Sequence, residues 1–391
     1  MFTRKKEILV FGFWMLMIVD ILWLGHNLVN QPEANASLAE NTKGINRKKE
    51  IESTFYYNQL TEEQQKAYET LRNGLMDRNT SIMLEDCDSD ALLRIWEAVL
   101  MDHPEIFWVN EFSYQKYMDD SVSCEVLPGY CYTLEEIKER QAKIEEFTDE
   151  FINGISSRES DYNKILYTYE TIIHHTDYDL NAMNNQHIDS VILGKASVCA
   201  GYAKTTKYLL NKLGVECVYV VGDVVTENGG AHAWTIVTCE GDTYFVDTTW
   251  GDPVYNEIVE SGSDIYLPEI SYDYLCCNEE HLFKTHEMNA DFEMPSCTSL
   301  EWNYYVVNGR YFTEYNSDEI FELIEKDISN QQKTSVFVFS NSAVYEQAKD
   351  DMINVQLSQG KALYDETYGT GGTSCYYQDD EMRNKIVFIW E

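Results

Sequence analysis

Three short segments of the chain contain the residue types of a thiol acyl-transfer site. They are SVCAGYA around Cys199, AHAW around His232 and YFVDTTW around Asp247. In such a site a thiolate is the nucleophile, an imidazole acts as its base, and a carboxylate orients the imidazole. Each segment alone is weak evidence. Three suitable residue types in this order predict a catalytic triad.

Cys199 is predicted to lie in the first turn of a helix that ends near Leu213-Gly214, where glycine is the expected residue. Ser197 is placed to cap this helix. Free N–H groups and the helix dipole favour an anion in a first turn, so thiols there have a lowered pKa. The N–H of Cys199 also points to where an oxyanion would form. The alternative is a buried structural cysteine.

His232 and Asp247 are predicted on the two strands of a hairpin that turns at Glu240-Gly241. With a two-residue turn, His232 faces Thr249, and Asp247 is its diagonal neighbour on the same face of the sheet. Such neighbours have Cα atoms about 5–8 Å apart. The Asp247 carboxylate is therefore expected to accept the imidazole N–H and fix its tautomer.

The stretch from about Tyr178 to Asp252 resembles the transglutaminase-like superfamily. The matching marks are VCxGYA at Cys199, HAW at His232 and DxTW at Asp247. The resemblance implies a papain-like core, in which a helix bearing the cysteine packs on an antiparallel sheet. The family includes protein cross-linking transamidases, cysteine proteases and peptide N-glycanases. It therefore implies a thiol enzyme that acts on amide bonds through a thioester, with hydrolysis and transamidation both open.

The family's mechanism also implies roles for other residues. In related enzymes the second oxyanion donor is a Gln or Trp upstream of the cysteine, and Gln186 is the candidate here. His286, in the segment LFKTH, resembles the family's surroundings of the site. No pattern matches the calcium sites of animal transglutaminases, and we expect no cofactor and no metal.

Three aromatic residues near the triad are candidates for a substrate groove, with core packing as the alternative: Tyr202, Trp234 and Trp250. The pattern Cys276-Cys277-x3-His281-x4-His286 has metal-ligand residue types but fits no common zinc spacing.

The formal net charge of −38 argues against binding to nucleic acid. The expected partner is a protein or peptide substrate, cell-wall peptide included. A different class of function also stays open, in which the domain is a non-catalytic binding or structural module at the cell surface.

The N-terminal segment has the pattern of a signal anchor. Arg4, Lys5 and Lys6 precede an apolar run over residues 8–25, which is interrupted by Asp20. Eighteen residues are just enough to cross a bilayer as a helix. The sequence therefore predicts a single membrane-spanning helix with the rest of the chain extracytoplasmic. The alternative is secretion after cleavage.

Cys124 and Cys131 flank a turn, and a disulfide between them is an alternative to two free thiols.

The predicted fold class is α+β, with five segments along the chain. These are a basic tip and anchor (1–30), a polar tether (31–52), a mostly helical accessory domain (53–156), the transglutaminase-like domain (157–290) and a small α+β module (291–391). Capping residues Thr61, Asp88 and Thr133 predict three helices in the accessory domain.

In the last module, Asn308-Gly309 between two aromatic stretches predicts a β-hairpin. Helices are predicted from Ser317 and over 342–352, and strands over 335–340 and 385–390.

Overall fold

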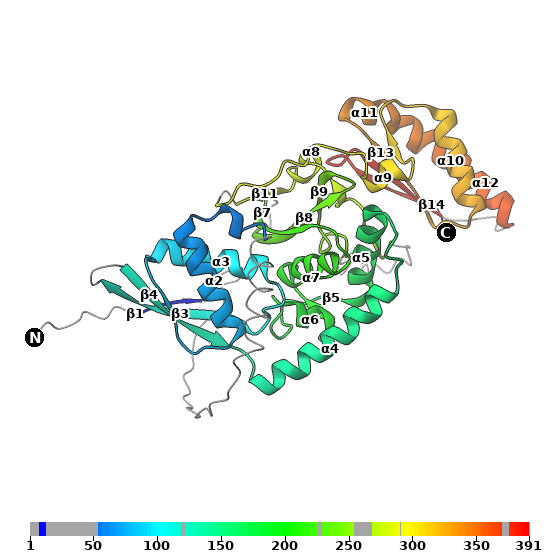
Figure 1. Cartoon of the computed structure of the whole chain (residues 1–391). Helices are drawn as coiled ribbons and strands as arrows, with labels where there is room; N and C mark the ends of the chain where they lie inside the picture. The colour runs from blue at the N-terminus through cyan, green and yellow to red at the C-terminus, as the bar shows by residue number, and fades with distance from the viewer. Residues whose placement is uncertain are drawn as a thin grey trace, which may run out of the picture. The chain divides into compact units, whose positions relative to one another are not determined.

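The structure is a computed structural model, and it describes residues 8–12, 54–118, 122–225, 229–253, 268–289, 291–369 and 375–390 (Figure 1). Contacts group the chain into two compact units. The first combines residues up to 159 with 174–236 and 286–295, and the second combines 160–173, 237–285 and the residues from 296 onward. The predicted domain boundaries stay predictions.

The accessory region contains the three predicted helices. They are α2 (Glu62–Met76), α3 (Ser89–Asp102) and α4 (Leu134–Asn153). Thr61 forms the predicted capping box of α2, since its hydroxyl accepts from the Gln64 amide at 3.3 Å and its amide donates to Gln64 Oε1 at 3.1 Å. Thr133 and Glu136 form the same box at α4. These contacts satisfy amides that the first turn of a helix leaves without intrahelical partners.

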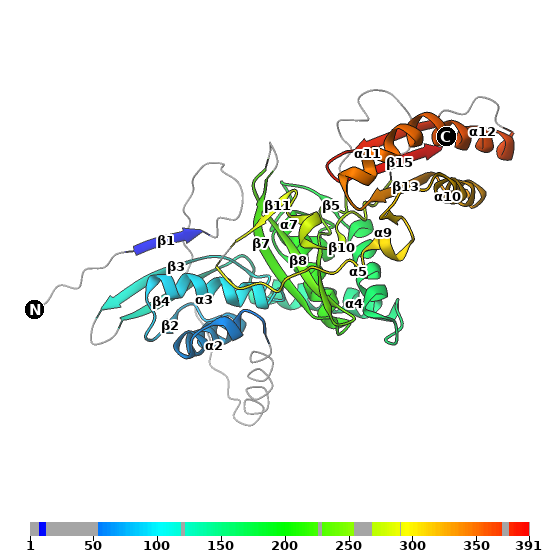
Figure 2. The ribbon, with the colours of Figure 1, turned by 90° about the horizontal axis from the view of Figure 1, so that it is seen from above.

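A four-stranded sheet, which is not predicted from the sequence, accompanies these helices. In the order β1-β3-β4-β2, it comprises β1 (Ile8–Gly12), β3 (Val109–Met118), β4 (Val122–Tyr130) and β2 (Ile82–Leu84). Trp96 of α3 stacks on Phe112 of β3 with ring centroids 4.2 Å apart, which joins helix and sheet in one core. Figure 2 shows α2 and α3 running along this sheet.

The predicted membrane-spanning helix is not found. Its first residues, Ile8–Gly12, form strand β1, which pairs antiparallel with β3 from Ile8↔Gln115 to Gly12↔Glu111. β-Branched Ile8 and Val10 favour this extended conformation. The rest of the predicted span and the tether lie outside the described residues.

Within the residues that the structure describes, no helix combines the length and the apolar character needed to cross a bilayer. The prediction of a membrane partner and of a single-pass membrane location through this helix is therefore wrong. The alternative of secretion after cleavage concerns residues that lie mostly outside the described part of the chain, so the structure does not test it.

The central part of the chain combines helices with a five-stranded sheet, as the α+β fold class predicts. The helices are α5 (Asp161–His175), α6 (Ile188–Ile192) and α7 (Cys199–Lys212). The strands, in the order β10-β9-β8-β7-β11, are Leu275–Cys277, Asp242–Val246, Ala231–Cys239, Cys217–Val224 and His286–Met288. β9 pairs antiparallel with β10, and β7 pairs antiparallel with β11.

Two predicted glycine positions have the backbone conformation that favours glycine. Gly214 follows α7 with φ of +80°. Glu240 and Gly241, with φ of 50° and 99°, form the turn between β8 and β9. Positive φ at both central residues is the requirement of a two-residue type I′ hairpin turn, so the predicted turn is confirmed.

The C-terminal module is a sheet covered by helices. Its strands, in the order β12-β13-β15-β14, are Tyr311–Phe312, Thr334–Phe339, Lys385–Trp390 and Cys375–Asp380. Its longer helices are α10 (Ser317–Ser329), α11 (Ser342–Asp351) and α12 (Leu357–Tyr368). Ile320, Ile324 and Ile328 follow one another at a spacing of four on α10, and all three are buried in the core of this module.

The predicted hairpin at Asn308-Gly309 is wrong. Residues Tyr304–Val307 form a short helix, α9, because the Asn303 side chain accepts from the Tyr305 amide at 3.1 Å and caps it. Gly309 has φ of +63° just beyond the end of this helix. Strand β12 then pairs parallel with β13 instead of returning on the preceding segment.

A buried ionic network joins the end of the chain to the segment before β10. Asp273 accepts from Tyr305 Oη at 2.8 Å and pairs with Lys385 and Arg383 of the last hairpin. Burial raises the pKa of Asp273, but Lys385 and Arg383 outweigh this and hold it below its usual range. The neighbouring residue, Tyr274, accepts the Asp247 amide at its carbonyl oxygen at 3.1 Å.

Candidate active site

Cys199 is the first residue of α7, in the predicted first turn, and only 2% of its surface is exposed. The cap differs from the prediction, since Val198 is the N-cap residue and no side chain caps the helix. Ser197 instead donates to the Asn185 carbonyl at 2.6 Å, and its hydroxyl lies 2.7 Å from Ser190 Oγ. Because Ser197 bonds to the loop before α6, its hydroxyl is used to position the start of the cysteine helix.

Gly201 allows that loop to approach the first turn of α7. A Cβ atom at residue 201 would lie 2.0 Å from Ser197 Oγ and 2.9 Å from the Asn185 carbonyl oxygen. The amide of Val198 donates to the same carbonyl at 3.1 Å. Asn185 is therefore held against the start of the cysteine helix, and Gln186 is the next residue of this loop.

His232 is the second residue of β8, and 5% of its surface is exposed. Two other rings surround it: the ring centroids of Trp234 and His286 lie 5.8 Å and 5.2 Å from that of His232. His286 begins β11, and its pairing with Val224 of β7 brings it to the site. From the sequence alone, His286 is indicated only as part of the family's surroundings of the site and of the cysteine–histidine pattern.

Asp247 directly follows β9 and is fully buried. Its Oδ1 accepts from the amides of Thr249 at 2.9 Å and Trp250 at 3.1 Å. These donors favour the ionised carboxylate in a place that water does not reach. Strand β9 ends at Val246, three residues before Thr249, so Thr249 lies in a turn rather than opposite His232.

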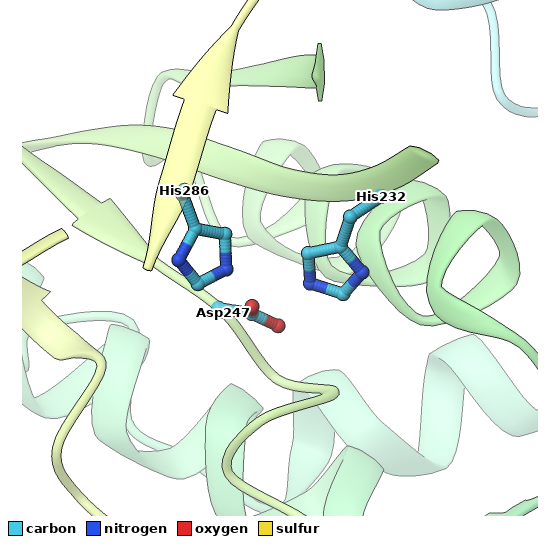
Figure 3. Close-up of side chains that lie close together, drawn as sticks. All are labelled: His232, Asp247 and His286. Atoms are coloured by element: carbon cyan, nitrogen blue, oxygen red, sulfur yellow. The ribbon is translucent and has the colours of Figure 1, made fainter. Parts of the chain in front are cut away.

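The side chains of His232, Asp247 and His286 lie together, and Figure 3 shows the carboxylate below the two imidazole rings. One nitrogen of each ring and one carboxylate oxygen all lie within 4.8 Å of one another. This arrangement suits a carboxylate that orients an imidazole base. Two imidazoles and a carboxylate are also donors that could hold a divalent metal ion. Among the described residues, this is the one such cluster, and it does not include Cys276, Cys277 or His281.

The surroundings of Cys199 are strongly desolvated. Burial first, and then the charge of Cys199, raise the pKa of Tyr219 above its usual range. The buried Lys204 ammonium lies 5.7 Å from the centre of the Tyr219 ring and donates to the Gln186 carbonyl at 3.1 Å. Burial lowers the pKa of Lys204 to about 8. Lys204 was not predicted from the sequence, since a helical lysine is ordinarily exposed.

The predicted groove residues differ in exposure. Tyr202 is fully buried and donates to the Thr176 carbonyl at 2.8 Å, and Trp234 is 1% exposed. Trp250 is half-buried and packs edge-on against Tyr274, with ring centroids 5.2 Å apart. A role in a substrate groove stays a prediction, which the exposure of Trp250 suits better than that of the other two. Cys124 and Cys131 are free thiols, so the alternative of a disulfide between them is not realised.

The family comparison agrees with the marks in the sequence. Residues 148–248 match the model of the transglutaminase-like superfamily. The chain contains a transglutaminase-like domain. The matched residues include α7 with Cys199, β8 with His232 and the end of β9 with Asp247. No curated protein sequence matches the chain.

Three solved structures resemble parts of the chain. A TGase is 17% identical over 36% of this chain and 44% of its own, with a TM-score of 0.26. A candidate cysteine protease from Cytophaga hutchinsonii is 15% identical over 43% and 61%, with a TM-score of 0.25. A candidate protease from Parabacteroides distasonis is 10% identical over 35% and 36%, with a TM-score of 0.21. The chain thus spans less than two thirds of each of these relatives.

Proposed function

We propose that the transglutaminase-like domain is a thiol enzyme that acts on amide bonds of protein or peptide substrates. Cys199 would be the nucleophile, His232 its base and Asp247 the residue that orients the imidazole. The observation that carries the proposal is that His232 and Asp247 are both buried, with a ring nitrogen and a carboxylate oxygen within 4.8 Å of each other. The residues that match the family model also include Cys199, at the start of a helix.

In the proposed reaction, His232 takes the thiol proton and the Cys199 sulfur attacks the amide carbonyl carbon. The C–N bond then breaks, and the leaving amine or ammonia takes the proton from the imidazolium. The remaining thioester is cleaved when water, or a second amine, attacks its carbonyl carbon and restores the thiol. Asp247 stabilises the imidazolium that exists between the two proton transfers.

The negative oxygen of each tetrahedral intermediate needs hydrogen-bond donors. The amide of Cys199 is one, because the first amides of a helix have no intrahelical acceptor. The Gln186 side chain is the proposed second donor. Its backbone is held by Lys204 and by the loop around Asn185.

Hydrolysis is favoured over transamidation only because water is the more abundant acceptor. Proteins, peptides and cell-wall peptides all remain candidate substrates. Ammonia release without new amine termini would indicate deamidation or cross-linking, whereas new amine termini would indicate proteolysis.

The central test is the rate at which iodoacetamide alkylates each cysteine, followed by mass spectrometry. Cys131 and Cys375 are half-buried reference thiols, more exposed than Cys199. An activated Cys199 should react faster than both despite its burial, and His232→Ala should slow it at least tenfold while leaving the reference thiols unaffected. His174→Ala, a change of an exposed histidine, is the matched control. If Cys199 reacts no faster than the reference thiols, and the His232 variant is like the wild type, the domain is a non-catalytic module.

A further inference from the structure

A cavity of about 260 Å³ lies beside α6. Its polar lining comprises Tyr132, Arg140, Asp179, Asp189 and Ser190. Its other walls include the small or apolar side chains of Ala182, Met183 and Ala196. A cavity of about 150 Å³ is enough to hold benzene, so this one has room for a ligand of several heavy atoms.

Asp189 is the most deeply buried charged group in this lining, with 1% of its side chain exposed. Its Oδ2 accepts from Tyr132 Oη at 2.6 Å and from Arg140 Nη1 at 2.9 Å. Its Oδ1 has no hydrogen-bond partner in the described part of the chain. A buried carboxylate in which one oxygen accepts two hydrogen bonds and the other accepts none is unusual in a protein interior.

The unpaired oxygen leaves the carboxylate poorly compensated. Burial raises the pKa of Asp189, and the opposing effects of Tyr132, Arg140 and the amides of residues 189 and 190 do not cancel this rise. A buried acceptor without a donor loses the hydrogen bonds that water would give it. A ligand that brings a donor to Oδ1 would restore that loss.

The charges around the cavity indicate which donor fits. Arg140 contributes one positive charge, while Asp179 and Asp189 contribute two negative charges. The guanidinium of Arg140 is already paired with Asp189 and lies over the Tyr132 ring, with its carbon 4.2 Å from the ring centre. One positive charge is therefore needed to balance the lining, and a group with several N–H donors could reach both carboxylates.

We propose that this cavity binds a primary ammonium group, either of a small amine or of a peptide N-terminus. The ammonium would donate to Asp189 Oδ1, with Asp179 as a second acceptor, and the attached carbon chain would lie against Met183 and Ala182. The site is distinct from the triad and does not depend on the proposed thiol chemistry.

The test is isothermal titration calorimetry of the full chain with n-butylammonium, and with n-butanol as the neutral probe of similar size. The ammonium should bind and the alcohol should not. Asp189→Asn should weaken ammonium binding at least tenfold, and Ala182→Trp should abolish it by filling the cavity. Asp177→Asn removes an exposed charge from the same segment and should leave binding unchanged. A tripeptide with a free or an acetylated N-terminus distinguishes the two sources of the group.

Three results would overturn the proposal: equal binding of the alcohol, wild-type binding by both cavity variants, or an equal loss in the Asp177 variant. The last result would indicate attraction to the acidic surface only. Circular dichroism establishes whether the Asp189 variant folds, and if it does not, the Ala182 variant decides alone. Because Cys199 alkylation is a separate readout, failure of this proposal and failure of the proposed function are distinguishable.

Discussion

Asp247 combines complete burial with backbone amide partners. Replacement by Asn keeps an oxygen that can accept from Thr249 and Trp250, so the local backbone should be retained. It removes the charge that would orient and stabilise an imidazolium at His232. The side chain therefore allows charge to be tested separately from structure.

We expect Asp247→Asn to slow alkylation of Cys199 by iodoacetamide at least tenfold, with little change in the melting temperature. Asp242→Asn, at the exposed start of β9, is the control and should alkylate like the wild type. An unchanged rate in the Asp247 variant would contradict the proposed role of this carboxylate.

Protonation of His281 should lower the stability of the fold. Burial lowers its pKa from 6.5 to about 4, with Arg383 and the nearby lysines acting in the same direction and Asp273 opposing them. Between pH 6.5 and about pH 4, His281 therefore binds a proton in the unfolded chain but not in the folded chain. The stability contributed by a neutral His281 is present above pH 6.5 and is lost as the pH falls toward 4.

The free energy of unfolding should fall by up to about 1.4 kcal/mol per pH unit over this range because of His281. Urea unfolding at several pH values measures the slope, and His281→Gln should make it shallower. His174→Gln, at an exposed position, should keep the wild-type slope. Equal slopes in all three proteins would contradict the assignment.

Single residues were predictable where a short segment carried the signal. Cys199 at a helix start and the turn at Glu240-Gly241 follow from local patterns, and the structure has both. His286 could not be placed at the site from the residues alone, because its position depends on the pairing of β11 with β7. The Ser197 cap was wrong because the N-cap position falls one residue later, at Val198, and the Ser197 hydroxyl donates to the Asn185 carbonyl.

At the scale of elements, β7 and β11 approach each other closely at Gly222. A Cβ atom there would lie 2.0 Å from the Glu287 carbonyl oxygen of β11 and 2.6 Å from the Trp234 ring. Both neighbours adjoin histidines of the site, since Glu287 follows His286 and Trp234 packs against it at 5.0 Å. The glycine therefore controls how near β11 can bring His286.

Gly222→Ala is expected to lower the free energy of unfolding by about 1–3 kcal/mol, as overpacking of a core commonly does. It should also slow Cys199 alkylation if the rings around His232 shift. Chemical denaturation and the alkylation assay measure the two effects. Asp223→Ala changes the next, exposed residue of the same strand and should leave both near wild type; a similar loss there would mean that the strand, not the close contact, is sensitive.

Elements with strong local signals were foreseen, and those defined by distant partners were not. Capped amphipathic helices such as α2 and α4 and the apolar strand β15 occur where predicted. The β3–β4 hairpin was missed because the three residues between its strands, Asp119, Asp120 and Ser121, lack the glycine of the strongest hairpin signals. Residues 8–12 illustrate the opposite error, since an apolar run suits a membrane helix and a sheet strand equally well until its partner is known.

At the scale of the whole molecule, the net charge of −38 is the dominant feature. Like charges on a folded surface repel one another more than in the expanded chain, and salt screens this repulsion. We expect the melting temperature to rise when ionic strength increases from about 0.01 M to about 0.15 M, a range over which the screening length falls from about 30 Å to about 8 Å.

Differential scanning calorimetry in NaCl and in KCl measures this rise. The two salts should act alike, because screening depends on ionic strength and not on the cation. A melting temperature that does not change with either salt would contradict the expectation, and a difference between them would indicate a specific cation site instead.

The ionic network at Asp273 has a consequence for the order in which the protein is made. Asp247 and its carbonyl partner at Tyr274 are synthesised long before Arg383 and Lys385, which neutralise the carboxylate next to that partner. Until those two cations leave the ribosome, the segment must either keep Asp273 in water or bury it uncompensated. Completion of the proposed site is thereby delayed until the final hairpin is synthesised, so a nascent or prematurely terminated chain is expected to hold a thiol that is not yet reactive.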